Sequence, residues 1–336
     1  MTKAKEYLIT GGTGSLGRQL IRQLIASGEK VRGIRIYSRD ELKQHNMKIE
    51  FKDSPIPIAY IIGDIRDYQR LTEVLKGVNY VFHTAALKQV PCSEENPLEF
   101  IQTNIYGTEN VMRACIHCNV DKGIFISTDK SVEPINLYGA TKMCAEKLWL
   151  RGSVYSGGHG TKFAAIRYGN VIGSRGSILD MVKQLPIDVK IPITDPRMTR
   201  FWIPLPKVAN FILTVSDSAV SGNVYIPKMI SCSLKTFMEA ATDTTIRDWE
   251  IIGLRSGEKM HEMLVNQEES ARTSTREDCY VVWPYGTPIS RDGNPMERTQ
   301  CGKLLRGGIA DSPIVVSDTR NPLFTREVSK IKELLK

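Results

Sequence analysis

The chain has 336 residues, of which 41% are hydrophobic, so it can bury the core of one large domain or of two smaller ones. No run of about 18 apolar residues occurs, and the first residues lead directly into a strand-like segment, which argues against a membrane span or a signal peptide. The formal net charge of +8 could suit a nucleic acid or an anionic small molecule, but no basic block is interleaved with aromatic residues. We therefore expect a cytoplasmic protein that binds neither nucleic acid nor membrane.

Short apolar runs alternate with helical patterns through the first half of the chain. The strand-like runs span residues 7–10, 31–37, 58–63, 78–84, 123–127 and 163–168, and helical spacing marks residues 16–25, 104–118 and 137–150. Strands that alternate with helices indicate right-handed crossovers in a sheet that is covered on both faces. The sequence therefore predicts an α/β fold with a doubly wound parallel sheet.

A glycine-rich sequence, Gly11-Gly12-Thr13-Gly14-Ser15-Leu16-Gly17, comes directly after the first strand and directly before the first helix. Glycines at these positions let backbone amides approach a pyrophosphate, which then lies at the positive end of the helix. We expect this loop to bind a dinucleotide.

The end of the second strand bears on which dinucleotide is bound. Tyr37 is followed there by Ser38, Arg39 and Asp40, about twenty residues after the last glycine of the loop. A hydroxyl and a guanidinium suit a 2′-phosphate, whereas a carboxylate suits the free ribose hydroxyls of NAD. The sequence therefore favours NADP, with NAD as the alternative.

Two later strand ends also point toward the cofactor. Asp64 and Ile65 follow the third strand, where Asp64 could contact the adenine amine or equally well cap the next turn. Ala85 and Ala86 follow the fourth strand and are small enough to leave room for a cofactor. We interpret His83, just before them, as a structural residue.

Tyr138 and Lys142 are four residues apart in a helical stretch, so both side chains can point into one site. A nearby ammonium lowers the pKa of a phenol, and a tyrosine activated in this way is a general base for an alcohol or sugar hydroxyl. Tyr138 is the only one of the twelve tyrosines with a lysine four residues later. It also follows a strand that ends in the polar sequence Ser127-Thr128-Asp129-Lys130.

The sequence changes in character after residue 170, where prolines become frequent and the predicted helices and strands become shorter. We expect residues 1–170 to form the dinucleotide-binding domain. Residues 171–336 should form mainly a smaller substrate-binding domain, with some segments returning to the first. Residues 284–313, rich in Gly, Pro, Arg and Ser, should loop over the surface, and residues 325–336 should form a terminal helix.

The seven cysteines have no regular spacing, and their odd number favours reduced thiols in a reducing compartment. Cys115 and Cys118 form the one CxxC spacing, which falls in a helical stretch without a second pair. We interpret it as ordinary helix packing and expect no metal site.

Taken together, the motifs resemble those of the extended short-chain dehydrogenase/reductases, and most closely those of the inverting UDP-N-acetylglucosamine 4,6-dehydratases that open the pseudaminic acid pathway. Besides the glycine loop, the matching stretches are residues 37–44, 85–91, 127–130, 134–142, 167–171, 194–202 and 257–259. The resemblance runs from residue 7 to about residue 265 and thins after about residue 270. It implies a Rossmann fold in the first domain.

The resemblance also implies a reaction. Tyr138, activated by Lys142, would take the proton of the sugar's 4-hydroxyl while hydride moves from C4 to NADP. Lys130 would then remove the C5 proton, Asp129 would protonate the departing C6 hydroxyl, and Thr128 would hydrogen-bond the keto oxygen. Hydride would return to C6, and C5 would be reprotonated on the opposite face. The product would be UDP-2-acetamido-2,6-dideoxy-L-arabino-hexos-4-ulose.

The same resemblance implies the binding residues. Those expected to hold the cofactor are Gly11, Thr13, Gly14, Ser15, Leu16, Gly17, Ser38, Arg39, Asp64, Ile65, Ala85, Ala86, Lys88, Asn104, Tyr138 and Lys142. Those expected to hold the UDP-sugar are Lys88, Asn170, Arg200, Arg255 and Glu258. The family similarity further suggests a homo-oligomer.

Other functions stay open at this point. Dehydratases that retain configuration more often carry Asp-Glu in place of Asp129-Lys130, so the prediction of inversion depends on Lys130. A 5,6-dehydratase would stop after elimination, and a 4-epimerase would need no acid–base pair for elimination. A non-catalytic NADP-binding sensor would commonly lose the tyrosine or the lysine, and this chain has both.

Overall fold

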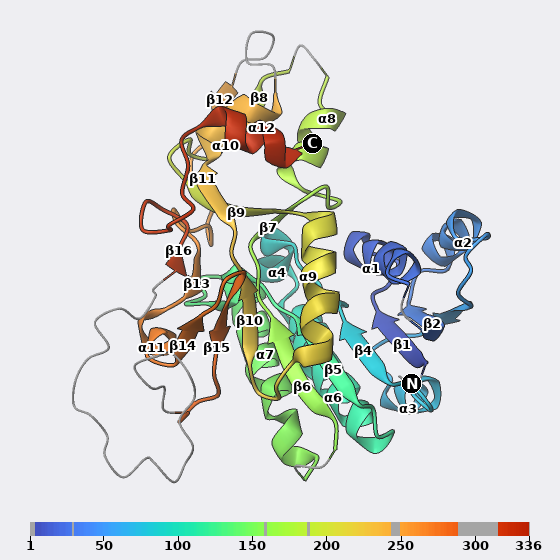
Figure 1. Cartoon of the computed structure of the whole chain (residues 1–336). Coiled ribbons are helices and arrows are strands. Elements are labelled where there is room, and N and C mark those ends of the chain that lie inside the picture. The colour runs from blue at the N-terminus through green and yellow to red at the C-terminus, as the bar shows by residue number, and fades with distance from the viewer. Residues whose placement is uncertain are drawn as a thin grey trace. The chain divides into compact units, whose positions relative to one another are not determined.

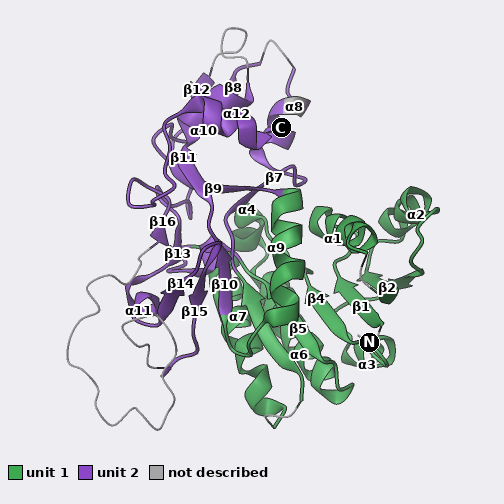
Figure 2. Cartoon of the chain, in the orientation of Figure 1, with its two compact units in different colours: residues 1–127, 136–166, 205–223 green, residues 128–135, 167–204, 224–336 purple. Residues whose placement is uncertain are grey.

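The computed structural model describes residues 4–28, 30–157, 160–186, 189–242, 249–287 and 315–335 (Figure 1). The chain divides into two compact units. The first consists of residues 1–127, 136–166 and 205–223, and the second of residues 128–135, 167–204 and 224–336 (Figure 2). The chain thus leaves the first unit at residue 128 and returns to it twice.

The strands of the first unit are parallel and are paired in the order β6-β5-β4-β1-β2-β3. They are β1 (Lys5–Thr10), β2 (Val31–Ser38), β3 (Ile58–Ile62), β4 (Tyr80–His83), β5 (Lys122–Ile126) and β6 (Lys162–Ile166). In β4 every residue is buried, as expected for a parallel strand with both faces covered. The predicted α/β class with a mostly parallel sheet is confirmed, and each predicted strand is present with its ends shifted by a few residues.

Two groups of helices pack together in this unit: α1 against α9, and α3, α6 and α7 one against the next (Figure 1). The helices are α1 (Ser15–Ala26), α2 (Glu41–Glu50), α3 (Tyr68–Val74), α4 (Val90–Glu95), α5 (Pro97–Phe100), α6 (Gly107–His117), α7 (Leu137–Tyr155) and α9 (Leu205–Ser218). Cys115 of the CxxC spacing is buried in α6 and Cys118 is half-buried just after it.

The helix predicted from Asn104 to Cys118 begins inside a π-helix, which is wider than an α-helix. Residues Ile101–Tyr106 form a π-helix, η1, that continues directly into α6. Such turns are rare and occur frequently at functional sites, because the extra residue re-aims a side chain. Asn104 is buried inside this segment.

The second unit contains several small sheets. β14 (Thr273–Thr275), β15 (Cys279–Val282) and β10 (Val224–Pro227) pair in an antiparallel manner. The other strands are β11 (Ile230–Ser233), β9 (Thr199–Pro204) and β7 (Asn170–Ile172) in one sheet, β12 (Trp249–Ile251) and β8 (Ile191–Ile193) in another, and β13 (Met263–Val265) with β16 (Val315–Val316). The helices are η2 (Asp129–Ser131, a 3-10 turn), α8 (Ile178–Gln184), α10 (Leu234–Ala241), α11 (Gln267–Ser270) and α12 (Val328–Leu335).

The core of this unit is built around an aromatic stack. The rings of Trp202 from β9 and Phe237 from α10 lie 3.5 Å apart and nearly parallel, at 6°. Both are almost fully buried, and Ile331 of α12 packs in the same apolar cluster. The terminal helix predicted from the sequence is therefore present as α12. Most of the loop predicted at residues 284–313 lies outside the described residues.

None of the helices that the structure describes has the length and apolar character needed to cross a membrane.

Candidate active site

The glycine loop between β1 and α1 leaves no space for a side chain at positions 11 and 17. Gly11 has a φ of +65°, and a Cβ on it would lie 2.8 Å from Cα of Ala85. A Cβ on Gly17 would lie 2.3 Å from the carbonyl oxygen of Gly12, so the first turn of α1 can approach the loop only with glycine there. Gly14 precedes α1 without a side-chain cap, and the first turn of the helix has no acidic residue. The N–H groups at this helix start therefore favour an anion such as a pyrophosphate.

The other predicted residues of the loop lie at the same helix start. Thr13 is buried, and Ser15 and Leu16 in the first turn of α1 are half-buried. Ala85 and Ala86 follow β4 and are also half-buried. The structure thus brings the glycine loop and the small residues after β4 together.

Asn104 ties the segment after β4 to two helices. Its Oδ1 accepts a hydrogen bond from the Leu87 N–H at 2.8 Å, and its Nδ2 donates to the Leu87 carbonyl oxygen at 2.9 Å. The same Nδ2 donates to Oγ1 of Thr141 on α7 at 3.0 Å. Lys88, which follows Leu87, is exposed. Asn104 therefore has a clear positioning role, which the sequence pattern alone did not reveal.

His83 joins this network as a structural residue. Its Nδ1 lies 2.7 Å from Oγ1 of Thr10 at the end of β1, and its Nε2 lies 2.9 Å from Oγ1 of Thr108. Burial, with a smaller contribution from Lys142, lowers the pKa of His83 to about 3, so the ring is neutral.

The residues at the end of β2 and just after it differ in their hydrogen bonds and ion pairs within the protein. Asp40 caps α2, because its Oδ1 accepts a hydrogen bond from the Lys43 N–H at 2.9 Å, and its carboxylate also pairs with the Lys43 ammonium. Ser38 is buried, and its Oγ accepts a hydrogen bond from Gln44 at 3.0 Å. Arg39 is half exposed, and its guanidinium lies 3.6 Å from a carboxylate oxygen of Asp64.

The Asp64 carboxylate stabilises the turn that follows β3 and also forms ion pairs. Its Oδ1 accepts a hydrogen bond from the Arg66 N–H at 2.9 Å, and its Oδ2 accepts two from the Arg66 guanidinium. Burial acts to raise the pKa of Asp64, but the hydrogen bonds from Arg66 outweigh it and hold the pKa below its usual range. The helix that follows is capped by Asp67 rather than by Asp64. Ile65, next to it, is buried.

Tyr138 and Lys142 lie one turn apart on α7, which begins after the capping residue Asn136. Both are buried, with 8% and 4% of their surfaces exposed. Nζ of Lys142 donates a hydrogen bond to the Ile126 carbonyl oxygen at 2.6 Å and lies 3.9 Å from the centre of the Phe125 ring. Burial lowers the pKa of Lys142 to about 7, so this ammonium can lose its proton near neutral pH.

The buried Asp129 and the half-buried Lys130 form an ion pair in the second unit. Nζ of Lys130 lies 3.1 Å from Oδ1 of Asp129, which also accepts a hydrogen bond from Oγ1 of Thr128 at 2.9 Å. The Asp129 side chain is fully buried, and its N–H donates to the Tyr168 carbonyl oxygen at 3.0 Å. An acid, a base and a hydroxyl are thus held within one short 3-10 turn.

Glu262 completes this cluster, and sequence reasoning missed it. Its Oε1 lies 3.1 Å from the same Lys130 Nζ and 4.0 Å from Nε of Arg200. Burial and the repulsion from Glu262 raise the pKa of Asp129 despite the attraction of Lys130. Burial also opposes ionisation of Glu262, but Lys130 and Arg200 outweigh it and lower the pKa of Glu262. Only proximity to the matched stretch 257–259 could have drawn attention to this residue.

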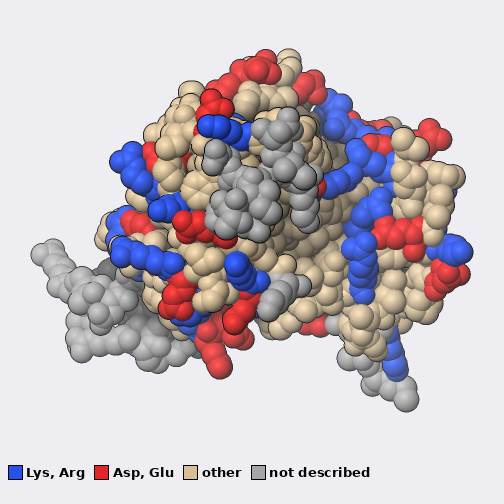
Figure 3. Space-filling view, turned by 90° about the horizontal axis from the view of Figure 1, so that it is seen from above, with Lys and Arg blue, Asp and Glu red and all other residues tan. Residues whose placement is uncertain are grey.

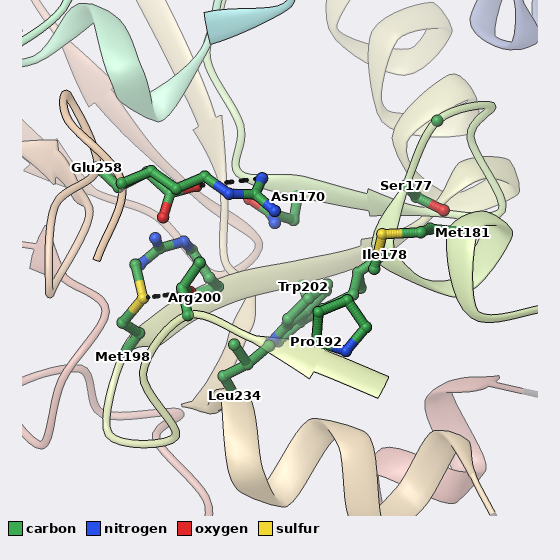
Figure 4. A pocket seen from close by; sticks show the side chains of 13 residues that line it. Asn170, Ser177, Ile178, Met181, Pro192, Met198, Arg200, Trp202, Leu234 and Glu258 are labelled. Atoms are coloured by element: carbon green, nitrogen blue, oxygen red, sulfur yellow. Dashed lines mark hydrogen bonds and ion pairs between the residues drawn. The ribbon is translucent and has the colours of Figure 1, made fainter. Parts of the chain in front are cut away.

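Four predicted substrate-binding residues surround one cavity of about 220 Å³ in the second unit. They are Asn170, Arg200, Arg255 and Glu258, and Figure 4 shows Asn170 and Glu258 on the side opposite the α8 residues Ile178 and Met181. Nη1 of Arg255 lies 4.0 Å from Oε1 of Glu258. The cavity therefore has a charged side and an apolar side.

Charges of both signs are mixed on the protein surface. On the face drawn in Figure 3, Lys and Arg lie among Asp and Glu, and a band of Lys and Arg on the right of the view has acidic residues beside it. Among the described residues, no group of three or more His, Cys, Asp or Glu side chains could hold a metal ion.

A family model described as "Polysaccharide biosynthesis protein" matches residues 7–284. The chain belongs to this family. It is 40% identical to a UDP-N-acetylglucosamine 4,6-dehydratase (inverting) from Campylobacter jejuni, over all of this chain and 97% of that protein. It is also 40% identical to a UDP-glucose 4-epimerase from Rickettsia rickettsii, over 83% of this chain and 82% of that protein. The predicted resemblance to this group of sugar-nucleotide enzymes is confirmed.

Solved structures of other proteins share the fold of this polysaccharide biosynthesis protein. Pen from Bacillus thuringiensis superimposes with a TM-score of 0.84 at 32% identity, over 99% of this chain and 97% of that one. DesIV, a dTDP-glucose 4,6-dehydratase from Streptomyces venezuelae with NAD bound, superimposes with a TM-score of 0.68 at 21% identity, over 76% of this chain and 86% of that one.

The buried Lys142 predicts a pH dependence of stability in the nucleotide-free protein. Its pKa is about 7 in the folded protein against an ordinary value of 10.5, so just above neutral pH the unfolded chain binds a proton that the folded chain has lost. The free energy of unfolding should therefore rise from pH 7 to pH 8.5, relative to Lys142→Met, by about 1 kcal/mol per pH unit. Urea titrations at several pH values measure this difference.

The exposed Lys147 on the same helix provides the control. Lys147→Met should keep the wild-type slope. Identical slopes for wild type and Lys142→Met would contradict the lowered pKa of Lys142.

Proposed function

We propose that this protein is a UDP-N-acetylglucosamine 4,6-dehydratase that inverts the configuration at C5. The observation that carries the proposal is the ion pair of the buried Asp129 with the half-buried Lys130, whose Oδ1 and Nζ are only 3.1 Å apart. Elimination of water needs a base for one proton and an acid for the leaving hydroxyl, and this pair offers both. The full-length similarity to an inverting dehydratase from Campylobacter jejuni supports the same reading.

The glycine loop fits a nicotinamide dinucleotide. The glycines at 11 and 17 bring backbone close where any Cβ would clash, and the start of α1 offers uncapped N–H groups for the pyrophosphate. We favour NADP, because the Asp40 carboxylate already caps α2 while the Arg39 guanidinium is half exposed. When bound, the cofactor would accept hydride from C4 and later give it back to C6.

The first proton step belongs to α7. Tyr138 takes the proton of the 4-hydroxyl, and Lys142 stabilises the phenolate and binds the nicotinamide ribose. The hydrogen bond from Lys142 to the Ile126 carbonyl oxygen fixes the ammonium one turn from the phenol. The depressed pKa of Lys142 would rise again beside a phenolate or a phosphate.

The elimination belongs to the turn after β5. Lys130 removes the C5 proton, which the neighbouring keto group has made acidic. Asp129 carries the proton for the C6 hydroxyl, consistent with its raised pKa, and Thr128 hydrogen-bonds the keto oxygen. Reprotonation of C5 on the opposite face gives the L-arabino product.

The UDP-sugar would use the cavity of the second unit. Arg200 and Arg255 offer positive charge for the diphosphate, Glu258 can accept hydrogen bonds from the uridine ribose, and Asn170 can hydrogen-bond a phosphate oxygen. Lys88, exposed after the segment that Asn104 holds, is proposed as an additional contact to cofactor or substrate.

A UDP-sugar 4-epimerase is the second candidate, because a relative of that name is equally identical over a shorter region. An epimerase moves hydride at C4 only and has no use for an acid and a base at C5 and C6, which is why we rank it second. Retaining 4,6-dehydration, 5,6-dehydration and catalytically idle NADP binding are ranked lower. Cytoplasmic placement and a homo-oligomer stay predictions.

The product of the reaction tests the proposal. We expect incubation with UDP-N-acetylglucosamine in deuterated water to give a 4-keto-6-deoxy sugar that carries deuterium at C5 and shows L-arabino couplings by proton NMR. D-xylo couplings would contradict inversion, an exocyclic alkene would indicate 5,6-dehydration, and a 4-epimer would make this protein an epimerase. No conversion would contradict the proposed activity on this substrate.

Removal of the Tyr138 hydroxyl should stop the reaction at its first step. Tyr138→Phe is expected to lower kcat by at least about a hundredfold, the usual range for a lost acid–base group, while the cofactor still binds. Tyr155→Phe is the matched control, because Tyr155 lies on the same helix with 65% of its surface exposed. Near-normal turnover of Tyr138→Phe would remove this tyrosine from the mechanism.

The choice of cofactor depends on Arg39. Arg39→Ala should weaken NADP binding by about tenfold or more, as expected for losing a charged hydrogen bond, and should leave NAD binding almost unchanged. Calorimetric titrations with both nucleotides measure the two affinities, with the exposed Arg70→Ala as control. Equal loss of affinity for both nucleotides would argue against a 2′-phosphate contact.

A further inference from the structure

Glu262 is held rigidly in the second unit. Its backbone N–H donates a hydrogen bond to Oγ of Ser317 at 2.8 Å, and its carbonyl oxygen accepts one from the Ser317 N–H at 2.8 Å. The Ser317 hydroxyl also lies 2.8 Å from Oγ1 of Thr199 on β9. Only 2% of Glu262 is exposed. These bonds anchor the backbone from which the Glu262 carboxylate extends.

The carboxylate points at Lys130 and is otherwise poorly satisfied. Oε1 of Glu262 lies 3.1 Å from the Lys130 Nζ, while Oε2 has no hydrogen-bond partner among the described residues. Oδ2 of the buried Asp129 also lacks one. Burial of two carboxylates around one ammonium costs stability unless the ammonium pairs with both. This costly arrangement indicates a role other than holding the fold together.

We propose that Glu262 is a positioning residue that orients Lys130 toward its task and stabilises the ammonium group that Lys130 forms when it accepts the C5 proton. This inference rests on the proposed function. Glu262 would act only through Lys130 and need not touch the substrate.

The movement of protons during the elimination shows at which point Glu262 would stabilise Lys130. The step starts once the Lys130 ammonium has passed its proton to the Asp129 carboxylate, 3.1 Å away, which leaves a neutral amine and a neutral acid. The C5–H bond breaks, its proton goes to Nζ, and its electron pair forms the C5–C6 double bond as the C6–O bond breaks. The hydroxyl leaves as water with the proton of Asp129. Lys130 ends as an ammonium and Asp129 as a carboxylate, and an ionised Glu262 at 3.1 Å favours the ammonium directly.

Other charged groups around Glu262 keep it ionised. Arg200 approaches from β9 with its Nε 4.0 Å away, and Lys259 contributes a further positive charge. Lys259 itself donates a hydrogen bond to the Val132 carbonyl oxygen, and Glu133 adds a negative charge near it. Lys130 and Arg200 together lower the pKa of Glu262, whereas burial and the charge of Glu262 raise the pKa of Asp129, so Asp129 binds a proton more readily than Glu262 does.

The first test needs no catalysis. The pH dependence of Lys130 acylation by a small anhydride, followed by peptide mass spectrometry, reports when this amine loses its proton. Glu262→Gln should shift half-maximal labelling to lower pH by about one unit or more, because a direct anionic neighbour is lost. Glu262→Asp, which keeps the charge, should shift it less. Equal labelling curves for wild type and Glu262→Gln would overturn the proposal.

The second test uses turnover of UDP-N-acetylglucosamine deuterated at C5. Glu262→Gln should lower kcat by about 10- to 100-fold, the range for losing a hydrogen bond to a charged group. It should also raise the deuterium isotope effect and move the acidic limb of the pH profile to lower pH. Glu262→Asp should recover part of the rate, and the exposed Glu277→Gln serves as the charge-matched control.

The outcomes separate this inference from the function itself. A lower rate in Glu262→Gln with an unchanged isotope effect and an unchanged pH profile would reduce Glu262 to a structural residue and overturn the inference. Wild-type protein that does not convert the sugar would sink the proposed function, and the labelling of Lys130 would still decide whether Glu262 controls this amine.

Discussion

The arrangement of the first compact unit depends on one buried amide. Asn104 binds both backbone groups of Leu87 and the hydroxyl of Thr141, so it joins the segment after β4 to η1 and to α7. An amide buried in this way must be fully hydrogen-bonded, because each unpaired group would cost about 1–3 kcal/mol. The same bonds fix α7 relative to the small residues beside the glycine loop. The position of Tyr138 and Lys142 within the first unit therefore follows from Asn104 and the π-turn that aims it.

The buried Lys142 and the half-buried Lys130 have opposite surroundings. Lys142 has a carbonyl oxygen and an aromatic ring as its nearest partners, and burial lowers its pKa to about 7. Lys130 instead lies between the carboxylates of Asp129 and Glu262. The first environment makes the proton easy to lose, and the second makes it easy to gain. These different settings suit the roles proposed for the two lysines, support of a phenolate for Lys142 and acceptance of a carbon-bound proton for Lys130.

The sequence predicted most of the fold because its strands are short apolar runs between helical patterns, and those runs became β1 to β6. The residues proposed to bind cofactor and substrate lie in local motifs, which is why the sequence singled them out, and their roles stay predictions. The role of Glu262 was not predicted, because its partner Lys130 is far away in the sequence and a single Glu belongs to no local motif. The π-helix at Ile101–Tyr106 was not predicted, because its residues also suit an α-helix and tertiary packing selects between the two forms. The capping role of Asp40, by contrast, is a local pattern that could have been read.

The choice between dehydratase and epimerase depends on why two buried carboxylates, those of Asp129 and Glu262, both pair with Lys130. Two carboxylate oxygens in this cluster lack a hydrogen-bond partner among the described residues, so an apolar cluster of equal volume could be at least as stable. Hydride transfer at C4 alone requires only the tyrosine, its lysine and a dinucleotide. Breaking a C5–H bond and a C6–O bond requires one group that gains a proton and another that loses one. In our proposal Lys130 gains the proton, Asp129 loses one, and Glu262 stabilises the ammonium group that Lys130 forms. An epimerase has no use for this chemistry.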